Sequence, residues 1–404
     1  MKQLIRNIAL LAVICMAFVG CEPKPHEDKT PPQTIIFYMA GTHLGSYFRV
    51  NRDAVKSALN YNIQGRSRVV VFYHTGKSDA ELMEYYFQDG LCQEKVLATY
   101  TLPAQMTATE MGYIFSDIVG RTPSKSHSLI IGSHGLGWIP IGAEPESSAA
   151  YLGTKKKADV LTHEELWERK GDIMTRYLGE DSCPQNRFDV TDLAQALTSA
   201  NVKMEYILFD ACFMGNVESI YDLRNNAKYI IGSPCEIMGA GFPYAKIMPE
   251  LLKGNGATSD LDAVCRIFNE DYAADPGYSG SIALIDCAQM DGLAQAMKRV
   301  NNADKKEYNQ SDIQSYEGHS SHIFFDLGDY VDKMCADEAA KSAFNEQLNR
   351  AVVSKYTLNS FLSMYGTTGR YKIDIFTGMN TSAPASVYRS AYEQTAWYKA
   401  THLN

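Results

Sequence analysis

The chain has 404 residues, of which 45% are hydrophobic and 21% are charged, a composition typical of globular proteins with one large or two medium domains. A formal net charge of −9 argues against electrostatic binding of nucleic acid or of an anionic membrane through a broad positive surface. We therefore expect no nucleic-acid partner.

The first 33 residues have the pattern of an export signal followed by a tether. Basic residues precede an apolar run over residues 8–20 that is too short to span a bilayer. The four residues that end at Cys21 resemble a bacterial lipobox. We therefore interpret residues 1–20 as a lipoprotein signal peptide and Cys21 as the lipidated residue. Residues 21–33 are charged and contain four prolines, which favours an extended tether. The alternative is a buried N-terminal strand with an incidental cysteine.

The cysteine pattern favours free thiols over a disulfide framework. Nine cysteines are present, and seven remain once Cys15 of the signal peptide and Cys21 are set aside. Their spacing matches neither a repeated disulfide framework nor a zinc-ligand pattern. Because seven is an odd number, at least one thiol is expected to be free, and no metal site is expected.

Beyond the tether, short apolar runs alternate with helical patterns. A continuous apolar run is typical of a strand that is buried on both faces of a parallel sheet. A hairpin is expected around Asp89 and Gly90, and Thr107 with Glu110 forms a capping-box pattern. The expected strands are 34–39, 68–74, 84–87, 95–101, 128–132, 205–209, 228–232, 281–286 and 371–376. The expected helices are 51–60, 107–119, 190–200, 217–225, 257–272, 290–300 and 325–334.

These elements predict an α/β fold in which helices cover both faces of a mainly parallel central sheet. Residues 141–187 are polar and lack periodicity, which indicates an insertion or an exposed loop. No linker divides the chain after residue 33. We expect a core over residues 34–250 and a C-terminal part of the same unit over residues 251–404.

Two reactive side chains follow predicted strands. In parallel sheets, catalytic groups gather at the carboxyl ends of the strands, where loops and helix N-termini meet. His134 follows the strand at 128–132 and precedes two glycines, and Cys212 follows the strand at 205–209. A helix N-terminus after Cys212 and a nearby imidazolium would favour the thiolate. Taken singly, each residue has a structural alternative, a hydrogen-bonded histidine or a buried cysteine.

Four segments resemble the clostripain-like cysteine peptidases, relatives of caspases, gingipains and legumains. They are residues 38–41 (YMAG), 133–138 (SHGLGW), 209–214 (FDACFM) and 233–236 (SPCE). The similarity covers most of residues 34–380. It implies a three-layer caspase-haemoglobinase-like fold and a cysteine endopeptidase that acts on proteins or peptides. Together with the N-terminal pattern, which predicts export and a lipid anchor at Cys21, this places the expected peptidase in the bacterial cell envelope.

The same resemblance implies roles for individual residues. Cys212 becomes the nucleophile and His134 the general acid, with the backbone N–H groups of Gly135 and Cys212 as the oxyanion hole. Family members often cleave after Arg or Lys, which requires a carboxylate in the S1 pocket. Asp210 is the first candidate for that carboxylate and Glu236 the second. Asp210 has an alternative role as a cap of the following helix.

The resemblance also implies activation by cleavage in the 141–187 loop, where the run of lysines that ends at Lys157 is the candidate site. The resemblance implies a peptidase that requires no cofactor, and it leaves open whether calcium affects the activity. One departure is the loop at residues 41–44 after the first strand, which lacks the acidic or amide residues expected in this family. Its His43 is either a second imidazole of the pocket or a replacement for a structural turn residue. Other readings remain: Cys235 as the nucleophile, a non-catalytic surface lipoprotein, or a hydrolase that uses Ser133, whose glycine spacing is wrong for a nucleophile elbow.

Overall fold

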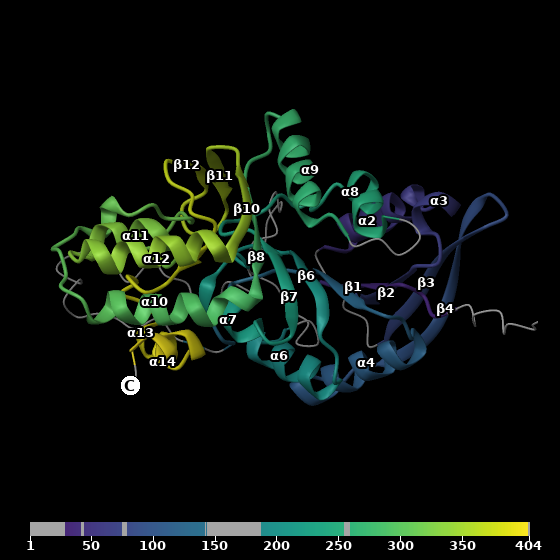
Figure 1. The fold of residues 1–404 in the computed structure, drawn as a ribbon. Helices are drawn as coiled ribbons and strands as arrows, with labels where there is room; N and C mark the ends of the chain where they lie inside the picture. The colour runs from purple at the N-terminus through teal and green to yellow at the C-terminus, as the bar shows by residue number, and fades with distance from the viewer. Residues whose placement is uncertain are drawn as a thin grey trace, which may run out of the picture. The chain divides into compact units, whose positions relative to one another are not determined.

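A nine-stranded sheet lies at the centre of the computed structural model, which describes residues 29–41, 44–74, 79–141, 143, 187–253 and 259–402 (Figure 1). Residues from Pro31 onward form one compact unit. From one edge to the other, the strands are β10 (Val352–Thr357), β8 (Ser281–Asp286), β7 (Ala227–Gly232), β6 (Met204–Asp210), β5 (His127–Gly132), β1 (Thr34–Ala40), β2 (Arg68–His74), β3 (Asp79–Gln88) and β4 (Leu91–Thr101).

The centre of this sheet is parallel and its edges are antiparallel. The pairs β1–β2, β1–β5, β5–β6 and β6–β7 are parallel, whereas β3 and β4 on one side and β8 and β10 on the other pair antiparallel. All seven residues of β1 are buried, as expected for a strand covered on both faces. The prediction of a mainly parallel sheet is therefore confirmed for the five central strands.

Helices cover both faces of the sheet (Figure 1). On one face lie α2 (Gly45–Ala58), α3 (Tyr61–Gln64), α8 (Tyr244–Leu252) and α9 (Leu261–Ala274). The other face is covered by α4 (Ala108–Arg121), α6 (Val190–Ser199), α7 (Val217–Leu223), α10 (Met290–Asn302), α11 (Leu327–Met334), α12 (Glu338–Ala351) and α14 (Ala396–His402). Alternate residues of β1 enter the two apolar cores, Ile35 and Phe37 on one side and Ile36 and Tyr38 on the other. The three-layer α/β prediction is confirmed.

The predicted hairpin is present and longer than expected. Its turn is formed by Asp89 and Gly90, whose φ angles of 53° and 82° are those of a turn that matches the twist of two antiparallel strands. Gln88 pairs directly with Leu91 across this turn. The Asp-Gly pair was therefore sufficient to locate the turn from sequence.

The predicted strand at 371–376 is wrong. The strand β12 (Gly369–Lys372) ends earlier and pairs with β11 (Ser360–Ser363) in a separate two-stranded sheet. After Lys372 the chain leaves this sheet, and the N–H groups of Asp374 and Ile375 donate to the Gln314 side chain instead. A second small sheet pairs β9 (Phe325–Asp326) with β13 (Asn380–Thr381), and α13 (Arg389–Tyr392) precedes α14.

Candidate active site

The two reactive side chains follow neighbouring strands at equivalent positions. Gly132, the last residue of β5, pairs in parallel register with Asp210, the last residue of β6. His134 lies two residues beyond Gly132, and Cys212 lies two residues beyond Asp210. The prediction that both follow adjacent strands of one sheet is confirmed, and both loops begin at the same edge.

The loops that carry these side chains are in van der Waals contact. A Cβ atom built at Gly135 would lie 2.4 Å from the carbonyl oxygen of Cys212, and one at Gly137 would lie 3.2 Å from the carbonyl oxygen of Phe213. Gly137 also has a φ of 59°, which strains other residues. Glycine is therefore required at both positions for the His134 loop to lie against the Cys212 loop.

Cys212 is fully buried, and its sulfur contacts the loop after β7. The N–H of Ile237 donates to Sγ at 3.4 Å, and the thiol lies 3.9 Å from the carbonyl oxygen of the same residue. Two backbone hydrogen bonds, from Phe213 to Cys235 and from Gly215 to Ser233, join the two loops on either side of this contact. An N–H donor at sulfur favours the thiolate over the thiol.

The expected helix N-terminus does not lie at the thiol. The helix α7 begins at Val217, so four residues separate it from Cys212, and the influence of a helix dipole fades within about one turn. Its N-cap is Asn216, whose side chain accepts a hydrogen bond from the N–H of Ser219. Asp210 is therefore not the cap of this helix, and the N–H of Ile237 replaces the helix as the local source of positive potential.

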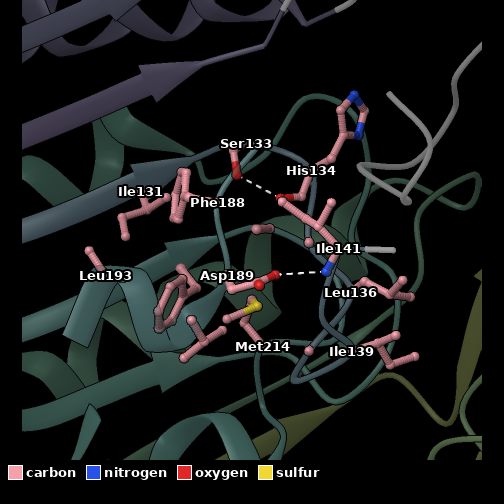
Figure 2. A pocket seen from close by; sticks show the side chains of 15 residues that line it. Ile131, Ser133, His134, Leu136, Ile139, Ile141, Phe188, Asp189, Leu193 and Met214 are labelled. Carbon is pink, nitrogen blue, oxygen red and sulfur yellow. Dashed lines mark hydrogen bonds between the residues drawn. The ribbon is translucent and has the colours of Figure 1, made fainter. Parts of the chain in front are cut away.

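A pocket beside His134 opens on the α6 side of the sheet (Figure 2). Its lining comes from the end of β5, the loop over residues 133–141, the start of α6 and the end of β6. In Figure 2 the imidazole of His134 points away from the apolar side chains of Phe188, Leu193 and Met214. The Ser133 hydroxyl donates its hydrogen to the carbonyl oxygen of His134 at 2.6 Å. This hydrogen bond disfavours the alternative in which Ser133 is the nucleophile.

Comparison with known proteins decides the identity of this arrangement. The sequence profile of the clostripain family, peptidase C11, matches residues 160–403. The chain belongs to this clostripain family. It is a cysteine peptidase, and the resemblance on which the sequence interpretation relied is confirmed.

Solved structures agree with this assignment. A secreted C11 cysteine protease from Bacteroides thetaiotaomicron, "iotapain", is 36% identical with a TM-score of 0.79, and the match covers 92% of this chain and 99% of that one. A clostripain from Bacteroides thetaiotaomicron ATCC 29148, in complex with the peptide inhibitor BTN-VLTK-AOMK, is 40% identical with a TM-score of 0.52, over 56% of this chain and 99% of that one. An inactive zymogen C11 protease from Parabacteroides distasonis, at 24% identity and a TM-score of 0.73, shares the fold over 92% of this chain and 99% of that one. No curated protein sequence matches the chain.

Two carboxylates of the peptidase were candidates for the S1 pocket, and both are buried. Asp210 is 1% exposed and accepts a hydrogen bond of 2.7 Å from the hydroxyl of Tyr244, the first residue of α8. Glu236 accepts hydrogen bonds from the Ser363 hydroxyl and from the N–H groups of Met364 and Tyr365. Glu236 therefore holds the end of β11 against the loop that follows β7.

Cys235 of the peptidase differs from Cys212 in its surroundings. Burial raises the pKa of the Cys235 thiol to about 12, so the thiol is protonated at neutral pH. A protonated thiol is a weak nucleophile. Cys212 is as buried as Cys235, so the two thiols differ in their contacts: the backbone N–H of Ile237 donates to the sulfur of Cys212, whereas the sulfur of Cys235 contacts the Ser233 hydroxyl.

Several predicted features of the peptidase lie outside the residues that the structure describes: the signal peptide at 1–20, Cys21, His43 and Lys157. Within the described residues, no group of three or more His, Cys, Asp or Glu side chains is placed to hold a metal ion. No helix in the described part of the chain has the length and apolar character needed to cross a bilayer.

A buried polar network behind the peptidase's two loops was missed by the sequence analysis. Its centre is Glu218 on α7, which accepts hydrogen bonds from the Thr381 hydroxyl at 2.7 Å and from the N–H of Ser382 at 3.1 Å. Residues 380 and 381 form the two-residue strand β13, and residue 382 follows it. A strand this short shows no hydrophobic periodicity from which it could be predicted. Burial raises the pKa of Glu218 from 4.5 to about 7.

The pKa of Glu218 predicts how the stability of the peptidase varies with pH. Because the folded pKa exceeds the unfolded one, the unfolded state loses its proton first, and the free energy of unfolding falls as pH rises from 4.5 to 7. The full loss is about 3 kcal/mol. Glu218→Gln is neutral and keeps an oxygen acceptor. Its stability relative to the wild type, measured by urea unfolding, is expected to rise by about this amount between pH 4 and pH 9.

The control for this comparison is Glu346→Gln, since Glu346 is exposed on α12. Its stability relative to the wild type is expected to stay nearly constant across the same range. An equal change in both variants would mean that Glu218 titrates as an ordinary surface carboxylate.

Proposed function

We propose that the peptidase cleaves peptide bonds with Cys212 as the nucleophile and His134 as the general acid. The observation that carries this proposal is the contact between the two loops, in which Gly135 approaches the carbonyl oxygen of Cys212 so closely that no side chain fits there. The loops that carry the two side chains begin after paired residues of β5 and β6 and are thereby held in contact.

The proposed reaction follows from the groups available there. The Cys212 thiolate attacks the scissile carbonyl carbon, and the N–H groups of Gly135 and Cys212 stabilise the oxyanion that forms. When the tetrahedral intermediate collapses, the C–N bond breaks and His134 gives a proton to the departing amine. Water then hydrolyses the thioester, which releases the acid and restores the thiol.

We further propose a preference for Lys or Arg at P1, with Asp210 as the carboxylate that pairs with the substrate cation. Asp210 accepts a hydrogen bond from Tyr244 of α8, and Cys212 belongs to the apolar core that includes α8, so both residues lie on the α8 side of the sheet. Glu236 is the weaker candidate, because three donors from residues 363–365 already use its oxygens. The inhibitor peptide bound to the 40% identical clostripain, VLTK, ends in lysine.

The same preference makes Lys157 the proposed site of activation by autocleavage. Cleavage after this lysine would separate the chain between His134 and Cys212, and it requires only the P1 preference already proposed. Export and lipidation at Cys21 are proposed from the N-terminal sequence, and the 36% identical relative is described as secreted. The proposed location is the bacterial cell envelope, with protein or peptide substrates.

Labelling with peptides that carry an electrophilic ketone tests the nucleophile and the P1 preference together. We expect a peptide that ends in Lys or Arg to label Cys212 about 10- to 100-fold faster than peptides that end in Asp or Leu, since a charge-assisted pair is lost. The labelled residue is found by mass spectrometry of the digested protein. Cys235 is the internal control, because it is buried in the adjacent loop and its thiol stays protonated.

Different results would contradict different parts of the proposal. Labelling of Cys235 in place of Cys212, or no labelling of a protein that is folded and processed, would contradict the assignment of the nucleophile. Faster labelling by the Asp or Leu peptide would contradict only the role of Asp210.

A further inference from the structure

A short buried segment near the C-terminus holds both loops of the active site. This segment, residues 380–382, is called the clasp below. Its first residue, Asn380, is fully buried and follows Cys212 by more than 160 residues in sequence. Its last residue, Ser382, is 1% exposed.

Asn380 joins the two loops on either side of the nucleophile. Its backbone N–H donates to the carbonyl oxygen of Gly215 at 2.9 Å, and its side-chain amide donates to the carbonyl oxygen of Pro234 at 2.6 Å. Its side-chain oxygen accepts a hydrogen bond of 2.6 Å from the Asn216 amide. Gly215 follows Cys212 by three residues, and Pro234 lies in the loop whose Ile237 N–H reaches the sulfur. Asn380 therefore fixes the sulfur and its donor relative to each other.

Ser382 joins the clasp to the loop of the proposed general acid. The indole N–H of Trp138, four residues after His134, donates to the Ser382 hydroxyl at 2.7 Å, and both groups are buried. The backbone N–H of Ser382 donates to Glu218, as does the Thr381 hydroxyl. Since Glu218 lies on α7, the clasp is itself anchored to the helix that follows the Cys212 loop.

We propose that the clasp is a positioning element for the peptidase reaction: Asn380 orients the Cys212 loop, and Ser382 orients the His134 loop through Trp138. This proposal rests on the proposed roles of Cys212 and His134. The two loops leave different strands and touch through glycine positions, which carry no side chains that could fix their spacing. The clasp supplies that fixed spacing, because Asn380 bonds to the Cys212 loop, Ser382 accepts from the His134 loop, and Thr381 between them bonds to Glu218 on α7.

The two ends of the clasp act on different steps of the reaction. Asn380 affects the thiolate, which every substrate needs. Ser382 and Trp138 affect the proton donor, which an amide needs because an amine leaves as its conjugate acid. An activated ester with a phenolate leaving group needs little protonation. The ratio of amide to ester hydrolysis therefore separates a positioning role at His134 from a general loss of folded protein.

The test uses Trp138→Phe, Ser382→Ala and the double variant of the processed full-length protein. Each single variant is expected to lower kcat for a peptide amide by about tenfold, the effect of one lost hydrogen bond, with KM unchanged. Hydrolysis of the activated ester and alkylation of Cys212 by iodoacetamide are expected to change less than about twofold. The double variant is expected to lose no more than either single one, because the two residues share one bond.

The other end of the clasp is tested with Asn380→Asp and Asn380→Ala. Both are expected to slow alkylation of Cys212 as well as amide and ester hydrolysis, and Asn380→Asp, which keeps the acceptor for Asn216, is expected to lose less. Thr34→Val is the matched control. It removes a buried hydroxyl that donates to the carbonyl oxygen of Thr122. Thr34 lies at the amino end of the central strand β1, away from the carboxyl ends that carry the active site, so all three rates are expected to stay unchanged.

Equal losses of amide and ester hydrolysis in Trp138→Phe and Ser382→Ala would overturn the positioning role, and so would unchanged rates in both. Failure of the proposed function has a different signature. Wild-type hydrolysis that survives complete alkylation of Cys212 would overturn the role of the nucleophile, whatever the clasp variants do. If Asn380 variants fail to fold, the Trp138 and Ser382 variants still decide the outcome.

Discussion

Replacing Cys212 by alanine is expected to lower kcat for peptide hydrolysis by at least about four orders of magnitude, because the proposed acyl-enzyme forms on its sulfur atom. The structural cost should be small. The side chain is buried, and the change removes one sulfur atom and leaves the N–H of Ile237 without that acceptor. We expect a loss of about 1–2 kcal/mol in the free energy of unfolding, so the variant remains folded.

Cys235→Ala is the matched control for this variant. The same substitution is made at a cysteine that is equally buried and lies in the neighbouring loop, where its carbonyl oxygen still accepts the hydrogen bond from Phe213. Turnover should remain close to that of the wild type. Equal turnover by Cys212→Ala and the wild type would reject the mechanism, and loss of turnover in Cys235→Ala instead would exchange the roles of the two thiols.

The central strands were predictable because they are buried on both faces. Strands β2 and β8 begin and end where the apolar runs indicated, and β1 and β6 differ only at their ends. In a continuous apolar run, the polar residues on either side mark where the strand begins and ends. Tertiary context was not needed to find these elements.

Two elements beyond β7, the helix α8 and the strand β10, were harder to predict because their local signals conflict with the final structure. The helix α8 contains Pro249 and begins after Pro243, and both residues read as helix breakers in isolation. The edge strand β10 alternates between exposed and half-buried residues, which is a weak signal of a strand. Burial of α8 against α2 and pairing of β10 with β8 decide these segments, and neither partner is adjacent in sequence.

The active site also has features that the sequence predicts and features that it does not. The positions of His134 and Cys212 after two buried strands were readable, because strand order places their carboxyl ends at one edge of the sheet. The source of thiolate stabilisation was not. Asn216 caps α7 and delays its start, and the donor at the sulfur is a backbone N–H from residue 237, which sequence does not mark. Asn380 and Ser382 were invisible for the same reason, since they act through single long-range hydrogen bonds.

Replacing His134 by alanine is expected to lower kcat for a peptide amide by about 10²- to 10⁴-fold, the usual contribution of a positioned proton donor. For an activated ester of the same peptide sequence the loss should be much smaller, since a phenolate leaves without a proton. Rates for both substrates, measured on the same preparation of processed enzyme, give the comparison.

The size of the ester effect distinguishes two roles for the imidazole. A general base that creates the thiolate would be needed for every substrate, so amide and ester hydrolysis would fall together, and alkylation of Cys212 would slow with them. A general acid affects the amide alone. His127→Ala is the control, because His127 is also buried, lies at the other end of β5 and contacts Thr122. A proportional loss for both substrates in His134→Ala, with His127→Ala unaffected, would assign His134 as the base. The Ile237 N–H would then not be sufficient to maintain the thiolate.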